Sequence, residues 1–265
     1  MNLKRAIEEG NVEAAKRLLD EDPSLAARPI PCGPLDQSQA EPLHYISDRA
    51  FEGKIKHQRQ AELAVLLLEA GAPVEGTGEN ETLLHGAVSL GQDAVAMVLL
   101  DYGADIEAIG RYPGIPDGTP LDFAVHFGMT DCVDMLVQRG AKIKTPRMAA
   151  GAGRLDLLKQ MEVTSPTDIL RTAAVCDQTH VVDWLLQSQL EPNANINGAT
   201  ALHWAAWEGK SRMVKFLLER GADPSRRDDD HNLTALGWAK YRRKTLGAGW
   251  GHDEVIALPW PDNAA

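Results

Sequence analysis

The sequence is poor in cysteine, in aromatic residues and in long apolar runs. Its three cysteines, Cys32, Cys132 and Cys176, are too few and too scattered for a disulfide scaffold or a zinc knuckle. The longest uninterrupted apolar run covers only residues 94–100, whereas a helix that spans a bilayer needs about 20 residues. The amino end becomes acidic before an apolar stretch develops, so we expect no signal peptide. These absences predict a cytoplasmic protein that does not bind membranes.

Basic residues are also in deficit. The 265-residue chain has 27 Lys and Arg against 38 Asp and Glu, a formal net charge of −11. An overall field of this sign opposes binding to a phosphate backbone, so we expect no nucleic acid partner. The length is sufficient for one large domain or two ordinary ones.

What the sequence does contain is an internal repeat. Stretches that begin at Thr82, Thr119 and Thr200 each reach a glycine 21 residues later, and the next start, Thr234, follows Thr200 by 34 residues. Each stretch has the pattern of two short helices, the second of which ends at a glycine that tolerates positive φ. Since no unit can cover its own apolar face, the units must stack.

The motif TALHWAA…GADP closely resembles the ankyrin repeat. The resemblance covers nearly the whole chain and implies an all-α solenoid of helix–turn–helix units with β-turn fingers. In that family the fingers and the first helices line a concave groove where partners usually bind. We therefore expect a single ankyrin-repeat domain over 1–265 with seven or eight units, at 1–30 (amino-terminal cap), 41–75, 82–106, 119–143, 145–162 (degenerate), 168–195, 200–224 and 234–260 (carboxy-terminal cap).

Three connections are longer than the repeat requires. The extra residues fall near 49–60, within 111–118 and near 243–250. Loops of this kind can fold over a groove and exclude water, which a plain protein-binding surface does not need.

Histidines recur at one place in the repeat, as His44, His85 and His203. A metal ladder is excluded on distance, since adjacent units lie roughly 10 Å apart and zinc holds its ligands at about 2 Å. The resemblance implies instead that these histidines hydrogen-bond neighbouring turns. We expect no metal site and no cofactor.

Aromatic residues concentrate on the expected first helices, at helical spacing that places pairs on one face. Such rings form the walls of a binding site or pack against the neighbouring unit. Trp207, Tyr241 and Phe127 lie near helix ends, where family members vary, which favours binding for these three. With the neighbouring arginines and the longer connections, the candidate binding residues are Tyr45, Arg49, Tyr112, Phe123, Phe127, Trp204, Trp207, Trp238, Tyr241 and Arg242.

One polar pair indicates possible acid–base chemistry. Asp122 replaces the repeat histidine of its unit, and His126 follows four residues later, so a carboxylate can orient an imidazole on one helical face. Asp48 and Arg171 would add further acidic and anion-binding groups. The alternative interpretation is an exposed pair worth about 0.3–0.5 kcal/mol.

Two functions follow from these features. The first is a non-enzymatic module that binds a protein or peptide in its concave groove. The alternative is a small-molecule-binding protein or a cofactor-independent enzyme of isomerase, lyase or cyclase type, with proton transfer by His126. Two capped ends make a monomer the expected state.

Overall fold

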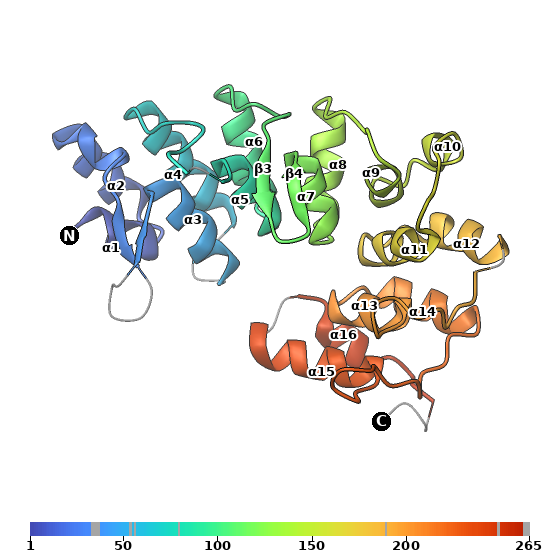
Figure 1. Cartoon of the computed structure of the whole chain (residues 1–265). Coiled ribbons are helices and arrows are strands. Elements are labelled where there is room, and N and C mark those ends of the chain that lie inside the picture. The colour runs from blue at the N-terminus through green and yellow to red at the C-terminus, as the bar shows by residue number, and fades with distance from the viewer. Residues whose placement is uncertain are drawn as a thin grey trace. The chain divides into compact units, whose positions relative to one another are not determined.

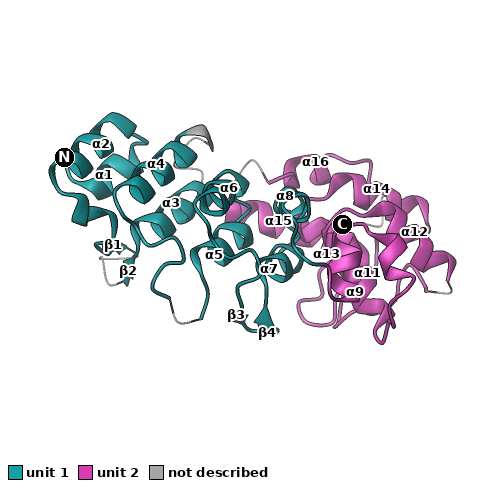
Figure 2. Ribbon diagram, turned by 90° about the horizontal axis from the view of Figure 1, so that it is seen from above, with its two compact units in different colours: residues 1–142 teal, residues 143–265 magenta. Residues whose placement is uncertain are grey.

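The computed structural model describes residues 1–32, 38–52, 55, 57–78, 80–188, 190–247 and 250–261. Within these ranges the chain forms sixteen α-helices, one 3₁₀ helix and two short β hairpins (Figure 1). Residue contacts divide it into two compact units, 1–142 and 143–265 (Figure 2). Consecutive helices pair throughout, as the repeat predicts.

Unit 1 contains four helix pairs and both hairpins. The register joins Ile30 to Ala40 in the first hairpin and Tyr112 to Ile115 in the second. The 3₁₀ helix Pro23–Ala26 follows the first pair. The elements are α1 (Leu3–Glu8), α2 (Val12–Glu21), β1 (Ile30–Cys32), β2 (Ser38–Ala40), α3 (Pro42–Phe51), α4 (His57–Glu69), α5 (Leu83–Ser89), α6 (Asp93–Asp101), β3 (Gly110–Tyr112), β4 (Ile115–Gly118), α7 (Pro120–His126) and α8 (Thr130–Gln138).

Unit 2 contains four further pairs. The pair over 145–162 is short, in keeping with its degenerate sequence, and α11 begins at Pro166, slightly before the expected start at 168. The helices are α9 (Pro146–Gly151), α10 (Leu155–Leu158), α11 (Pro166–Val175), α12 (Thr179–Gln187), α13 (Ala201–Trp207), α14 (Ser211–Glu219), α15 (Ala235–Leu246) and α16 (His252–Ile256).

The repeat threonines begin the first helices. Thr82, Thr119 and Thr200 are N-caps of capping boxes, in which the threonine side chain and the third helical residue satisfy each other's backbone N–H groups. Glycines follow the second helices α4, α6, α8 and α14, and Gly221 has φ +87, a conformation that side chains resist. The predicted helix boundaries therefore have an identifiable chemical cause.

The core lies between the helices of each pair and between neighbouring pairs. The leucine of the repeat motif is completely or almost completely buried wherever it occurs, as Leu84, Leu121 and Leu202 show. Small residues such as Ala205 and Ala206, which are also fully buried, let the helices approach closely. No helix in the described ranges is long and apolar enough to cross a membrane.

Two of the three longer connections extend helices. Helix α3 has 10 residues and α15 has 12, whereas α5, α7 and α13 have seven each. The rest of these two insertions includes residues 53, 54, 56, 248 and 249, which lie outside the described residues. The third insertion forms the β3–β4 hairpin.

Candidate functional site

An apolar hollow lies between α13 and α15, which are the first helices of the last two helix pairs. It has a volume of about 320 Å³ and is lined by Trp207, His231, Leu233, Trp238 and Tyr241. We call these five residues the α13–α15 pocket. Its rim reaches solvent, because Tyr241 is 55% exposed and the His231 side chain is 71% exposed.

Helix spacing brings the rings of this pocket together. Trp207 closes α13, and Trp238 and Tyr241 lie three residues apart on α15, so they share a face. The Trp207 and Tyr241 rings are nearly parallel, with centroids 6.3 Å apart, while the Trp238 ring meets Trp207 edge-to-face at 5.5 Å. Trp204 packs behind them, 5.3 Å from Trp238. Three of the six predicted tryptophan and tyrosine binding residues therefore line one hollow, and a fourth, Trp204, packs against Trp238.

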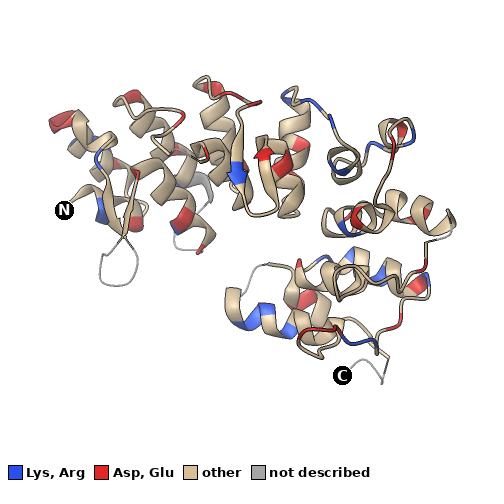
Figure 3. Ribbon diagram, viewed as in Figure 1, with Lys and Arg blue, Asp and Glu red and all other residues tan. Residues whose placement is uncertain are grey.

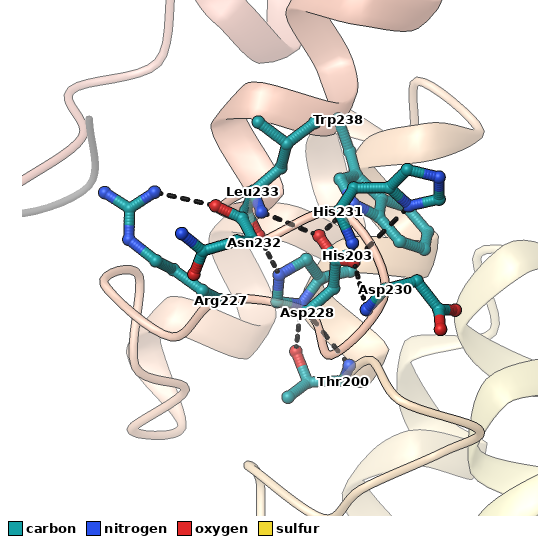
Figure 4. Close-up of polar contacts among 9 residues, drawn as sticks. All are labelled: Thr200, His203, Arg227, Asp228, Asp230, His231, Asn232, Leu233 and Trp238. Atoms are coloured by element: carbon teal, nitrogen blue, oxygen red, sulfur yellow. Dashed lines mark hydrogen bonds and ion pairs between the residues drawn. The ribbon is translucent and has the colours of Figure 1, made fainter.

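Asp228 organises the finger that forms the other wall of the pocket (Figure 4). Its carboxylate accepts hydrogen bonds from the backbone N–H groups of Asp230, His231 and Leu233 at 2.6–3.0 Å. It also accepts the Nε1–H of Trp238 at 2.9 Å. The buried Asp228 side chain thus fixes both the finger backbone and the indole of Trp238.

The same contacts set the protonation state of Asp228. Burial by itself would raise the pKa of this carboxyl, but the hydrogen bonds from His231, Trp238, Leu233 and Asp230 together outweigh burial and lower the pKa to about 2. The group is therefore a carboxylate throughout the physiological pH range.

Two arginines lie over tryptophan rings. The guanidinium of Arg171 is 5.0 Å from the Trp204 ring centroid, and that of Arg242 is 4.6 Å from the Trp207 ring centroid. Burial lowers the pKa of Arg171, an effect that Asp168 opposes. Burial also raises the pKa of the nearby Glu208, against the attraction of Lys210, Arg242 and Arg171.

Two of the repeat histidines make hydrogen bonds both within their own repeat and to the next one. In His85 and His203, Nδ1 accepts the N–H of the capping threonine at 3.2 and 3.3 Å. Nε2–H donates to the carbonyls of Gly118 and Leu233 respectively, each at 3.1 Å. This pattern requires the neutral ring, and burial lowers the pKa of both histidines. The predicted hydrogen bonding to neighbouring turns is confirmed for these two, whereas the His44 side chain is 44% exposed and lies 3.6 Å from Asp48.

Two of the predicted binding residues in unit 1 are inaccessible. Phe123 is completely buried and Tyr45 is 1% exposed. The Tyr45 hydroxyl donates to Glu8 at 2.6 Å, and Arg49 lies over the Tyr45 ring at 5.0 Å while it pairs with Glu52 at 2.8 Å. The expectation that Phe123 and Tyr45 contact a partner is therefore wrong, because neighbouring helices of the stack cover these rings.

The β3–β4 hairpin covers the end of α7. Tyr112, which is 40% exposed, has its ring centroid 6.2 Å from Phe123, 5.2 Å from Phe127 and 6.0 Å from His126. His126 and Phe127 themselves are 4.9 Å apart. The enlarged finger thus lies on the aromatic end of a first helix.

The predicted acid–base groups have structural partners. The Asp122 carboxylate accepts the backbone N–H of Thr119 at 2.9 Å and its hydroxyl at 3.1 Å, which completes a capping box. Asp48 lies on α3, and burial raises its pKa against the influence of His44 and Arg49. Helix α5 packs against both α3 and α7, so Asp48 and Asp122 come from helices on opposite sides of it. Arg171 belongs to unit 2.

The described residues hold no group of three or more His, Cys, Asp and Glu side chains able to bind a metal ion. Two lining residues of the pocket, His231 and Leu233, and the supporting Asp228 were not among the predicted binding residues. Asp228 is a charged residue in a finger, yet it is only 5% exposed. In the sequence, Asp228 precedes Trp238 by ten residues across one finger, and this spacing is the feature that could have indicated their contact.

Comparison with known proteins gives a consistent result. The family model for ankyrin repeats (3 copies) matches residues 55–147 and 148–228. The chain is 22% identical to the putative ankyrin repeat protein FPV022 of fowlpox virus over 92% of this chain and 45% of that protein. It is 29% identical to the B-cell lymphoma 3 protein homolog of Mus musculus over 69% of this chain and 38% of that protein. The chain thus spans less than half the length of these two curated relatives.

One solved structure aligns along the whole chain. The human ASB11 ankyrin repeat domain aligns with 100% of this chain and 95% of its own, at 20% sequence identity and a TM-score of 0.44. The family model covers more than half of the sequence, and the repeat threonines, histidines and glycines have the structural roles described above. The chain belongs to the ankyrin repeat family.

Proposed function

We propose that this ankyrin repeat protein is a non-enzymatic interaction module that holds an apolar or aromatic side chain of a protein or peptide partner in the α13–α15 pocket. The observation that carries the proposal is the group of three rings, Trp207, Trp238 and Tyr241, around a hollow open to solvent. Repeat proteins use extended concave surfaces for binding, and the pocket is built from first helices and a finger, the elements that line the groove in this family.

The size and composition of the pocket suit one large side chain. Its volume of about 320 Å³ is at the lower end of the range of about 300–1,000 Å³ that is usual for ligand sites. Tryptophan and tyrosine are the residues that most often dominate binding energy at interfaces, where truncation costs about 2 kcal/mol or more.

The pocket is also preorganised. Asp228 holds the Trp238 indole and the finger backbone, and Trp238 in turn meets Trp204 and Trp207 edge-to-face. A partner side chain therefore enters a site whose walls are already ordered, which reduces the entropy cost of binding.

Two further parts of the proposal concern the setting of the protein. We propose a cytoplasmic monomer, and three free cysteines support a reducing compartment. The net charge of −11 supports a partner other than nucleic acid.

Selection from a random peptide library displayed on phage, with the whole chain immobilised, tests the proposal. Enriched clones are retested on Trp207→Ala and Tyr241→Ala, and on Tyr102→Ala as a matched control, since Tyr102 is another exposed tyrosine at 42%. We expect clones whose binding drops at least about tenfold on the two pocket variants and is unchanged on the control. Enriched clones that bind all three variants equally would contradict the proposal.

A further inference from the structure

Helix α15 carries an unusual charge for this protein. Its sequence ALGWAKYRRKTL contains four basic residues and no acidic residue, whereas the whole chain has a net charge of −11 (Figure 3). The remainder of the chain therefore carries −15, and this helix is a basic segment beside the pocket.

Two of the four basic side chains are already engaged. Arg243 pairs with Asp253 at 2.6 Å. Arg242 is half-buried, with its guanidinium over the ring of the pocket residue Trp207. Its position is thus fixed by packing.

The other two, Lys240 and Lys244, are exposed and flank Tyr241 in the sequence. They are four residues apart, an arrangement in which like charges on a helix repel each other. No ion pair of either lysine occurs within the described part of the chain. An anionic group bound along this row relieves the repulsion and gains two positively charged partners.

The finger beside the pocket carries charges of both signs, with Arg226 and Arg227 next to three aspartates. Asp229 and Asp230 lie there, and Asp229 Oδ2 accepts a hydrogen bond from Asn195 at 3.0 Å. The mixed charges of the finger therefore offer an acidic ligand no net attraction, whereas α15 offers the exposed Lys240 and Lys244.

From these observations we propose that the partner is an acidic peptide segment in which one aromatic or large aliphatic residue fills the α13–α15 pocket while flanking Asp or Glu residues lie along Lys240 and Lys244. This inference rests on the proposed function, because it specifies the chemistry of the partner of the same pocket. Charge complementarity of this kind sets specificity and association rate more than it sets total affinity.

Peptides resynthesised from the pocket-dependent clones provide the test. Each is compared with a version in which every Asp and Glu is replaced by Asn or Gln, by fluorescence polarisation in about 50 mM and about 300 mM salt. We expect the clones to be rich in Asp and Glu, and neutralisation to weaken binding about three- to tenfold at low salt and much less at high salt.

Protein variants complete the test. Lys240→Gln combined with Lys244→Gln is expected to weaken the acidic peptide about three- to tenfold and to leave its neutral version within twofold. Lys215→Gln, which removes an exposed lysine of α14, is the matched control and should change neither.

The outcomes separate the two proposals. Pocket-dependent clones that are neutral or basic, or neutralised peptides that bind within twofold, overturn the inference but leave the proposed function intact. A dimer that Tyr241→Ala dissociates also overturns the inference, since a second copy of the chain would then fill the pocket. If no clone depends on Trp207 or Tyr241, the proposed function itself fails.

Discussion

The indole Nε1–H of Trp238 donates a hydrogen bond to Asp228 Oδ2 at 2.9 Å, and the same carboxylate oxygen accepts the backbone N–H of Leu233 at 2.8 Å. This pair joins a first helix to its finger across ten residues of sequence. One buried carboxylate therefore holds both the finger wall of the pocket and the Trp238 indole.

Asp228→Asn should therefore destabilise the protein and loosen the pocket. The amide nitrogen cannot accept the hydrogen bonds that the carboxylate accepts, and each donor left unsatisfied in a buried place costs about 1–3 kcal/mol. Chemical denaturation measures the loss. Asp230→Asn in the same finger is the control and should stay within about 0.5 kcal/mol of wild type; equal losses from both variants would show that Asp228 does not have this role.

Acid should remove the contribution of Asp228. Its pKa is lowered from 3.8 to about 2 in the folded chain, so the stabilisation is fully present above about pH 4 and is lost as pH falls toward 2. The shift corresponds to about 2 kcal/mol. Denaturation at pH 5, 4, 3 and 2 should show a difference between wild type and Asp228→Asn that shrinks with acidification. A constant difference would contradict this account.

Mild acid should act through the repeat histidines. Burial lowers the pKa of His85 and of His203 below 6.5, so their neutral rings favour the folded state above about pH 6.5, and the unfolded chain takes up protons first as pH falls below it. Thermal melting between pH 8 and 5 should show falling stability. The decline in stability should be smaller in the double variant His85→Gln/His203→Gln than in wild type. His231→Gln alters an exposed ring and should show the same decline as wild type.

Core and pocket positions should respond differently to truncation. Leu202 is 1% exposed, and Leu202→Ala should cost about 2–5 kcal/mol. Trp207 is half-buried at the rim of an existing hollow, so Trp207→Ala should cost less than half as much while it abolishes binding of pocket-dependent peptides. Melting that is equally impaired in both variants would place Trp207 in the core.

Gly209 marks a close approach of two backbones. A Cβ at this position would lie 2.1 Å from the carbonyl oxygen of Trp250, and Gly209 has φ +66. Gly221 also has positive φ, +87, but nothing lies within 4 Å of its Cβ position. Gly221→Ala should therefore cost about 1 kcal/mol from backbone strain alone, and Gly209→Ala clearly more. The difference in denaturation midpoint measures the steric part.

The repeat, its threonine caps and its glycine helix ends could be located from the sequence, because they depend on local interactions. Thr200 caps a helix whose third residue returns the hydrogen bond, and Gly221 ends a helix because its backbone has positive φ. Such rules act within a few residues, so the spacing from Thr to Gly was sufficient to predict the helix pairs and the family.

The tertiary structure decided which aromatic rings are accessible. Phe123 and Trp204 occupy equivalent positions in their repeats, yet Phe123 is fully covered whereas Trp204 is only half-buried behind an open pocket. The tertiary structure also gave Asp228 a role that its surface-like sequence context did not indicate. Exposure depends on what the neighbouring repeat and its finger place over a ring, and those contacts join residues some 30 positions apart, beyond the reach of any local pattern.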